Sequence, residues 1–300
     1  MPKEKLHSVL AQSNLLSDHI KQIADFSLAN VTIRIVTHNM LNKCHNEPWP
    51  DNAWNIAENA EQYSARLKLL AQEYKNDISH GATIVALQEA PRGEIAESFF
   101  NSMNLKTSWK FEVRETGDTD EQALMFIYNE SVTGEIQEVA ELLDQRANSY
   151  RFKINGQEVN FINVHIPYGA SFDDKLPSTV FKLQELMKIE ENELKIRFGD
   201  HNANTSRYKD LLVWQKELPT SLAYNIKTKE FSFIDDRDGN LYKNYDGFAV
   251  SDNYQDKGYS YTLYPSQLVI PNTDSNAEFT VTSVPNLPQL GALDEFNETV

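Results

Sequence analysis

The stretch "IRFGDHNANT" (residues 196–205) joins an apolar, strand-like segment to a cluster of polar side chains. Apolar residues lead into Gly199, and Asp200, His201 and Asn202 follow it directly. A carboxylate, an imidazole and an amide placed together are groups that hold a metal ion or move a proton. The stretch therefore predicts a strand that delivers chemical groups at its end, with an ordinary polar turn as the alternative.

Strands and helices alternate irregularly along the rest of the chain. Alternating or continuous apolar runs predict strands at 31–39, 82–90, 123–129, 149–154, 159–167, 245–251 and 278–284. Apolar residues at helical spacing predict helices at 3–28, 57–77, 177–193 and 206–217. This mixture favours an α/β layered sandwich over a strictly alternating βαβ fold. We expect a helical extension (residues 1–30), one domain (31–290) and an acidic tail (291–300).

Composition restricts the class of protein. The chain has 300 residues, of which 40% are hydrophobic and 24% charged, which is ordinary for a soluble domain. No run is long enough to span a membrane and the N-terminus lacks an apolar signal sequence, so we expect a cytoplasmic location, with export as an effector left open. Cys44 is the single cysteine, which excludes an intrachain disulfide and a cysteine zinc cluster.

The net charge of −16 disfavours general coating of nucleic acid. It does not exclude a phosphate-bearing substrate, because a divalent cation in the site reverses the local potential.

Four further polar residues lie where predicted strands begin or end. Each has a structural explanation when taken alone: Asn39 as a turn cap, Glu89 as a salt-bridge partner of a nearby lysine or arginine such as Arg92, His165 as a core histidine and Asp246 as the residue that begins a strand through an Asx-turn. Together with the opening stretch, they place polar groups at five strand ends. Open α/β sheets collect their sites at such ends, so we expect the groups to converge.

Converging carboxylates and amides suit a hard divalent cation such as Mg²⁺ or Mn²⁺. The chemistry that such a cation supports best is attack on a phosphorus centre, because it neutralises oxygens and helps to form the nucleophile.

Five short segments, in this order, resemble the endonuclease/exonuclease/phosphatase superfamily: "VTHNML" (36–41), "IVALQEA" (84–90), "INVHIPYG" (162–169), "FGDHNAN" (198–204) and "NYDGFAVS" (244–251). They cover roughly residues 31–290. The resemblance implies the DNase I-like fold, a four-layered α/β/β/α sandwich of two packed mixed sheets flanked by helices. The letters "NML" are more loosely similar to the deadenylase-like branch.

The resemblance also implies roles for these residues. Glu89 would hold the cation, supported by Asn39. Asp200 would orient or deprotonate the attacking water, and Asn202 would place the water or the phosphate. His165 would hydrogen-bond a phosphate oxygen as negative charge develops on it.

The chain departs from the family at the end, where a Ser-Asp-His-x-Pro segment normally supplies a histidine that a residue such as Asp246 orients. No histidine follows His201. We align "VPNLPQL" (284–290) with that segment, so that Asn286 replaces the histidine, in preference to "SDNY" (251–254). Three explanations stay open: His201 supplies the imidazole, the reaction proceeds slowly on the metal and Asp200, or the site has become a binding pocket.

We therefore predict a Mg²⁺- or Mn²⁺-dependent phosphodiesterase or phosphatase, with a nuclease as the favoured kind. The substrate would be a phosphate ester in nucleic acid or in a phospholipid headgroup, and Arg92, Arg207 and Asn286 would line its site. The alternative is a catalytically weakened domain that binds a partner protein or a phosphorylated ligand.

Overall fold

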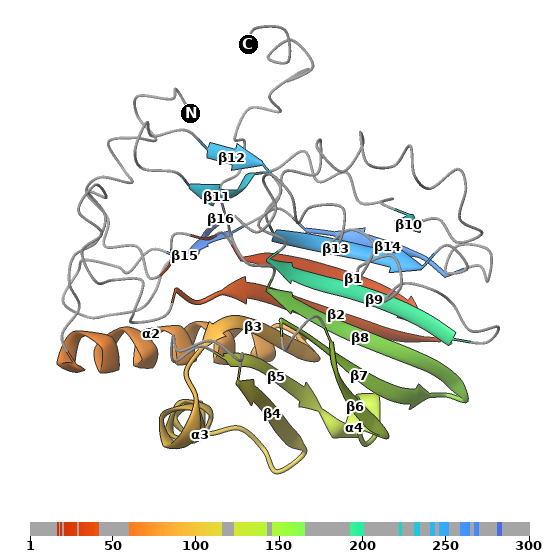
Figure 1. Ribbon diagram of the computed structural model, residues 1–300, viewed down its shortest axis with the longest axis horizontal. Helices are drawn as coiled ribbons and strands as arrows, with labels where there is room; N and C mark the ends of the chain where they lie inside the picture. Colours follow the sequence, from red (N-terminus) through yellow and green to blue (C-terminus); the bar gives the residue numbers. More distant parts are fainter. Residues whose placement is uncertain are drawn as a thin grey trace, which may run out of the picture.

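The computed structural model describes residues 17, 19, 21–28, 30–41, 60–115, 123–142, 146–165, 193–200, 222–223, 231–234, 241–243, 246–251, 259–264, 267–269 and 281–283. Within these residues, two six-stranded sheets pack against each other, and helices cover the outer face of the first (Figure 1).

The first sheet has the order β14-β1-β2-β3-β5-β4. Its strands are β14 (Tyr261–Leu263), β1 (Gln22–Leu28), β2 (Val31–Asn39), β3 (Ile84–Ala90), β5 (Ala123–Asn129) and β4 (Trp109–Glu115). The second sheet has the order β10-β13-β9-β8-β7-β6. Its strands are β10 (Leu222–Ala223), β13 (Asp246–Ser251), β9 (Glu193–Asp200), β8 (Gln157–His165), β7 (Ala147–Ile154) and β6 (Glu138–Leu142).

The remaining described elements are peripheral to the two sheets. They are the helices α2 (Ala60–Ser79), α3 (Gly93–Ser102) and α4 (Glu130–Thr133) and two two-stranded sheets, β11 (Phe231–Ile234) with β12 (Leu241–Lys243) and β15 (Gln267–Val269) with β16 (Val281–Ser283).

Each sheet has one parallel pair at its centre, β2 with β3 and β8 with β9, and the other described pairs are antiparallel. The carboxyl ends of the parallel strands bring Asn39, Glu89, His165 and Asp200 to one edge of the sandwich. Strand β13 runs antiparallel to β9, and its first residue, Asp246, pairs with Asp200. Topology alone therefore gathers the polar strand ends that the sequence singled out.

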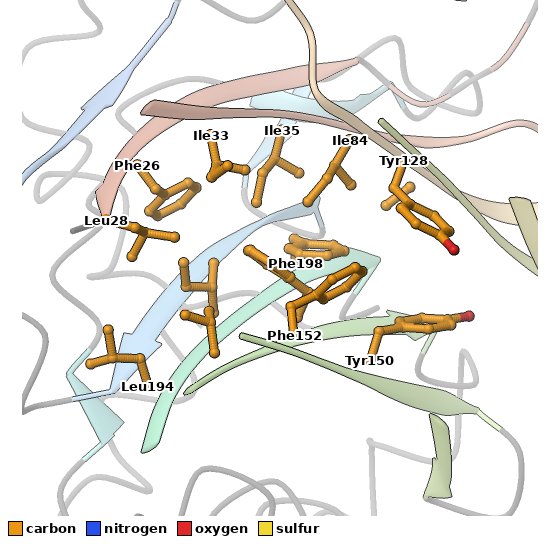
Figure 2. Packing of buried hydrophobic residues seen from close by; sticks show 14 of the residues in the cluster. Phe26, Leu28, Ile33, Ile35, Ile84, Tyr128, Tyr150, Phe152, Leu194 and Phe198 are labelled. Atoms are coloured by element: carbon orange, nitrogen blue, oxygen red, sulfur yellow. The ribbon is translucent and has the colours of Figure 1, made fainter. Parts of the chain in front are cut away.

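The sheets are held together by an aromatic core between them. The ring of Phe126 on β5 stacks on that of Tyr150 on β7, with centroids 4.1 Å apart. Figure 2 shows Ile33, Ile35 and Ile84 of the first sheet facing Phe152 and Phe198 of the second. A second cluster packs the apolar faces of α2 and α3 on the other side of the first sheet.

The structure confirms the predicted α/β sandwich of two packed mixed sheets. The predicted strands at 31–39, 82–90, 123–129, 149–154, 159–167, 245–251 and 278–284 and the helix at 57–77 are present, with shifted ends. The predicted helices at 177–193 and 206–217 and the tail at 291–300 lie outside the described residues, apart from Glu193, which begins β9.

The helix predicted over residues 3–28 is wrong for its last seven residues, which form β1. Ala24, Phe26 and Leu28 alternate on one face of this strand and are buried in the core between the sheets. Because β1 pairs with both β2 and β14, sheet hydrogen bonding and core burial outweigh the helical spacing seen in the sequence. The sheet thus begins before the predicted domain boundary at residue 31.

Candidate functional site

A β-bulge in β3 aims Glu89 at the edge of the sheet. Leu87 pairs with Met125 and Ala90 with Ala123, so β3 has one residue more than β5 over this stretch. Glu89 has a positive φ of 49°. A bulge of this kind breaks the regular alternation and redirects a side chain.

Asn39 links the carboxylates of the two sheets. Its Nδ2 donates to Glu89 Oε1 (2.9 Å) and to Asp200 Oδ2 (3.0 Å). Its Oδ1 accepts from the backbone N–H of Leu41 at 3.0 Å. The amide nitrogen therefore faces both carboxylates, and Asn39 holds them in place rather than presenting an oxygen between them. All three side chains are buried.

His165 lies against the same pair of carboxylates. Its Nε2 is 3.4 Å from Glu89 Oε1 and 3.7 Å from Asp200 Oδ2. On the other side of the ring, Nδ1 lies 3.4 Å from Nη1 of Arg146, whose backbone carbonyl accepts from the N–H of His165 at 2.8 Å. Burial lowers the pKa of Arg146, and the nearby charge of Glu89 opposes that shift. The guanidinium adds positive charge to a largely acidic site.

A polar layer separates this group from the aromatic core. Gln88 Nε2 donates to Asn163 Oδ1 at 2.7 Å and to Thr37 Oγ1 at 3.0 Å. Asn163 Nδ2 donates in turn to the carbonyl of Leu87 at 3.2 Å. The bonds between Gln88 and Asn163 and from Asn163 to Leu87 connect the two sheets, and the bond from Gln88 to Thr37 lies within the first sheet, so together they fix the strand ends relative to one another.

The aspartate at the start of β13 is paired with a histidine from the other end of the chain. His19 Nδ1 lies 2.7 Å from Asp246 Oδ2, and its Nε2 lies 3.8 Å from Asp200 Oδ2. The sequence led us to expect the partner of Asp246 near Asn286, which lies outside the described residues. His19 occupies the place beside Asp246 where that partner was expected.

Sequence reasoning missed His19 and Arg146. The signal for His19 was the run Ser17-Asp18-His19, which has the Ser-Asp-His letters of the expected late segment but stands near the N-terminus. Arg146 comes directly before β7, and no feature of the sequence marks it.

The structure thus brings together five of the predicted residues: Asn39, Glu89, His165, Asp200 and Asp246. Arg92, the example given for a salt-bridge partner of Glu89, does not take that role: among the described residues, Glu89 contacts Asn39 and His165. Arg92 forms an exposed ion pair with Glu115, with 3.6 Å between Nη1 and Oε2. Three other predicted residues, Asn202, Arg207 and Asn286, and also His201, lie outside the described residues.

The donor set fits a divalent cation. One candidate ligand atom each from Glu89, His165 and Asp200 lie within 4.8 Å of one another, and the same holds for His19, Asp200 and Asp246. Three carboxylates, Glu89, Asp200 and Asp246, are at most 7% exposed here. Buried carboxylates this close together need compensating positive charge, and carboxylate oxygens are the ligands that Mg²⁺ and Mn²⁺ prefer.

No protein-family model matches the chain, and no curated protein does. Several solved structures match the chain. An endonuclease/exonuclease/phosphatase family protein from Bacteroides thetaiotaomicron is 14% identical, with 74% of this chain and 83% of that one covered and a TM-score of 0.51. An endonuclease/exonuclease/phosphatase family protein from Leptotrichia buccalis is 14% identical, with 73% of this chain and 87% of that one covered and a TM-score of 0.47. A humanized D. rerio TDP2 is 12% identical, with 78% of this chain and 84% of that one covered and a TM-score of 0.49.

At such low identities the likeness concerns the fold and does not extend to activity. Among the described residues, no helix has the length and apolar character needed to cross a membrane.

Proposed function

We propose that this chain, which has the fold of the endonuclease/exonuclease/phosphatase proteins, hydrolyses phosphate esters with the help of a divalent cation. The observation that supports the proposal most strongly is the bridge that Asn39 forms between Glu89 and Asp200. It brings two buried carboxylates from different sheets to one amide group, an arrangement that is costly in a protein without a cationic ligand.

Glu89 is the carboxylate that would hold the cation, with Asn39 fixing its orientation. Bound there, Mg²⁺ or Mn²⁺ would neutralise charge on the phosphate and help to form the nucleophile. Asp200 would accept a proton from the attacking water. The water oxygen forms a bond to phosphorus while the ester P–O bond breaks, so the leaving oxygen must gain a proton or depart as an anion.

His165 and Arg146 would bind the phosphate oxygens. The Arg146 guanidinium can only donate, so Nδ1 of His165 accepts from it and the ring proton lies on Nε2, the nitrogen that faces Glu89 and Asp200. That N–H is placed to donate to an oxygen on which negative charge develops. Asn202, which follows Asp200 by two residues, would position the water or the phosphate.

The alternative of a weakened domain that binds a protein or a phosphorylated ligand rested on the absence of a late histidine. The pairing of His19 with Asp246 removes that reason, so we favour the enzyme. Within the enzyme class, a nuclease stays our specific prediction.

The test is a substrate panel of RNA, DNA, a phosphoinositide and sphingomyelin, assayed with Mg²⁺ and with Mn²⁺. We expect cleavage of at least one substrate by the wild type and losses of about 10²–10⁴-fold in kcat for Glu89→Gln and for Asp200→Asn. Mn²⁺ titration by calorimetry should show weaker binding by Glu89→Gln than by the wild type.

Glu115→Gln is the matched control, because this carboxylate is exposed and its ion pair is with Arg92. If the wild type cleaves none of the panel, or if Glu89→Gln cleaves as fast as Glu115→Gln, the proposed function is wrong.

A further inference from the structure

The free edge of β4 lies away from the candidate catalytic site. Among the described strands, β5 alone pairs with β4, which is the last strand of the first sheet. On β5, Ala123 stands opposite Ala90, next to Glu89, whereas Tyr128 stands opposite Ile84 at the start of β3. The part of β4 beside Tyr128 is therefore at the other end of the sheet from Glu89.

A groove of about 470 Å³ follows this edge, and we call it the β4 groove. One side of it is β4, and the other is the connection from β5 to β6, including Glu130 and residues 135–139 (Figure 1). Side chains from both faces of β4 line the groove. Phe111 comes from the face that packs on α3, and Glu112 from the face toward the second sheet. The groove thus lies where an added strand would lie.

The side of the groove toward the second sheet has an excess of negative charge. The groove is lined by two cations and four carboxylates, namely Lys110, Arg114, Glu112, Glu130, Glu135 and Glu138. Glu138 is paired with Arg151 at 2.9 Å, and Arg114 lies 3.6 Å from Glu112. Within the described part of the chain, neither Glu130 nor Glu135 forms an ion pair. The groove therefore has room for a further cation.

This negative charge is concentrated around the hydroxyl of Tyr128, which lines the groove. Burial raises the pKa of Tyr128 to about 12, and the charges of Glu130, Glu112 and Glu135 add to that shift. Figure 2 shows the hydroxyls of Tyr128 and Tyr150 pointing out of the aromatic core on the same side. A cation at this position would meet carboxylates and a phenol oxygen that can accept a hydrogen bond.

The other side of the groove is apolar. The rings of Phe100 on α3 and Phe111 on β4 lie 4.4 Å apart and both line the groove, together with Trp109. Side chains of a strand alternate between the two faces of its sheet. A strand placed along β4 would therefore direct one set of side chains to the aromatic rings and the other set to the carboxylates.

We propose that the β4 groove binds an extended segment of a partner protein in which arginine and apolar residues alternate. The backbone of the segment pairs with the free edge of β4, its arginine side chains meet the carboxylates, and its apolar side chains meet Phe100 and Phe111. A guanidinium suits the acidic side better than an ammonium group, because it is less strongly hydrated and donates to several carboxylates at once. The proposal does not depend on the proposed function.

The charges on β4 also make the groove selective. Lys110, Glu112 and Arg114 alternate on the face of β4 toward the second sheet, opposite Tyr128, Phe126 and Leu124 of β5. Charges that point inward on an edge strand keep out strands that do not match them. The net charge of −16 further favours a basic partner over an acidic one.

The probe is a peptide of alternating arginine and valine, titrated by calorimetry into the full chain. We expect it to bind the wild type, and to bind more weakly as the salt concentration rises. A peptide with citrulline in place of arginine has the same shape without the charge and should bind about 10-fold more weakly. A peptide with N-methylated backbone amides cannot pair with β4 and should bind about 10-fold more weakly as well.

Substitutions in the groove should change the affinity in opposite directions. Glu130→Gln combined with Glu135→Gln removes two carboxylates and should weaken binding of the arginine peptide by about 10-fold. Lys110→Gln removes a competing cation and should strengthen binding by about 2- to 5-fold. A gain of affinity cannot come from a damaged fold, so this variant tests the charge of the groove directly.

The matched controls change exposed charges outside the groove. Glu61→Gln combined with Glu158→Gln alters the net charge as much as the groove double variant does, and Lys68→Gln alters it as much as Lys110→Gln does. Both controls should bind the arginine peptide with the affinity of the wild type.

The place of binding is measured by hydrogen exchange. The arginine peptide should slow exchange of backbone amides in residues 109–115, because pairing protects the edge of β4. Glu89→Gln should leave the peptide affinity unchanged, and the groove variants should bind Mn²⁺ as the wild type does. The two proposals can therefore fail separately.

Four results would each overturn the proposal. They are no binding of the arginine peptide, equal binding of the arginine and citrulline peptides, equal losses in the groove double variant and its control, and unchanged exchange in residues 109–115. If N-acetyl-arginine amide or the N-methylated peptide binds as tightly as the arginine peptide, the edge of β4 takes no part and the proposal is also wrong.

Discussion

Gly199 lets β9 approach β8 closely, one residue before Asp200. Its φ is +127°, and a Cβ added there would lie 2.1 Å from the carbonyl oxygen of Val164. Neither the conformation nor the space suits any other residue.

We therefore expect Gly199→Ala to lower the free energy of unfolding by about 2–5 kcal/mol, through backbone strain and overpacking together. Urea denaturation measures the loss. Gly247→Ala is the matched control, because Gly247 pairs with Gly199 on β13 and an added Cβ there has no atom within 4 Å. Similar stabilities for the two variants would contradict this explanation.

Also at the scale of residues, the convergence of the strand ends could be predicted from the sequence, and the partner of Asp246 could not. Asn39, Glu89, His165 and Asp200 could be found because parallel strands bring their carboxyl ends to one edge, so local pattern and topology agree. His19 is 227 positions away from Asp246, and no local pattern contains a contact of that separation.

At the scale of elements, His38 on β2 connects His19, before β1, to Tyr74 on α2, and its ring is neutral. Burial lowers the pKa of His38 to about 3, from an ordinary 6.5. Below pH 6.5 the unfolded chain binds a proton that the folded chain does not, so stability present above that pH is lost as the pH falls toward 3.

The expected loss is about 1.4 kcal/mol per pH unit, or about 3 kcal/mol between pH 6.5 and roughly pH 4. His38→Gln keeps an N–H for the carbonyl of His19 and should remove this part of the pH dependence. Unfolding free energies measured across the pH range test this, with His80→Gln as the control at an exposed histidine. A slope in His38→Gln as steep as in the wild type would show that His38 is not responsible.

The first strand, β1, shows a case in which apolar residues at helical spacing predict the wrong secondary structure. Leu16, Ile20 and Ile23 fit a helix, but Phe26 and Leu28 alternate as a strand and face the core. A pattern of three or four apolar residues cannot distinguish the helical period of about 3.6 residues from the strand period of about 2. The decision comes from two neighbouring strands, β2 and β14, which satisfy the backbone of β1 on both sides.

At the scale of the whole molecule, the site is formed by two sheets, so its geometry depends on how they pack. The first sheet contributes Asn39 and Glu89, and the second contributes His165, Asp200 and Asp246. The order of motifs could be predicted from the sequence. The way the N-terminal segment enters the site could not, because that requires the packed arrangement of both sheets with α2.

The relative position of the two sheets, and so of the site residues, therefore depends on the core between them. Phe126 lies at the centre of that core. Its ring packs against those of Tyr150 and Phe152 on β7 and of Phe161 and Phe198 on β8 and β9. We expect Phe126→Ala to lower the free energy of unfolding by about 3–5 kcal/mol, because it leaves a cavity between the sheets.

Phe111→Ala is the matched control, since Phe111 pairs with Ile127 on the neighbouring strand but is only partly buried, against Phe100 on the outer face. The cavity in Phe126→Ala also loosens the registry of the two sheets, so Mn²⁺ affinity should fall in that variant at temperatures where it is still folded. Calorimetric titration of both variants checks this. Unchanged affinity in a destabilised Phe126→Ala would show that the polar layer of Gln88 and Asn163 alone maintains the site.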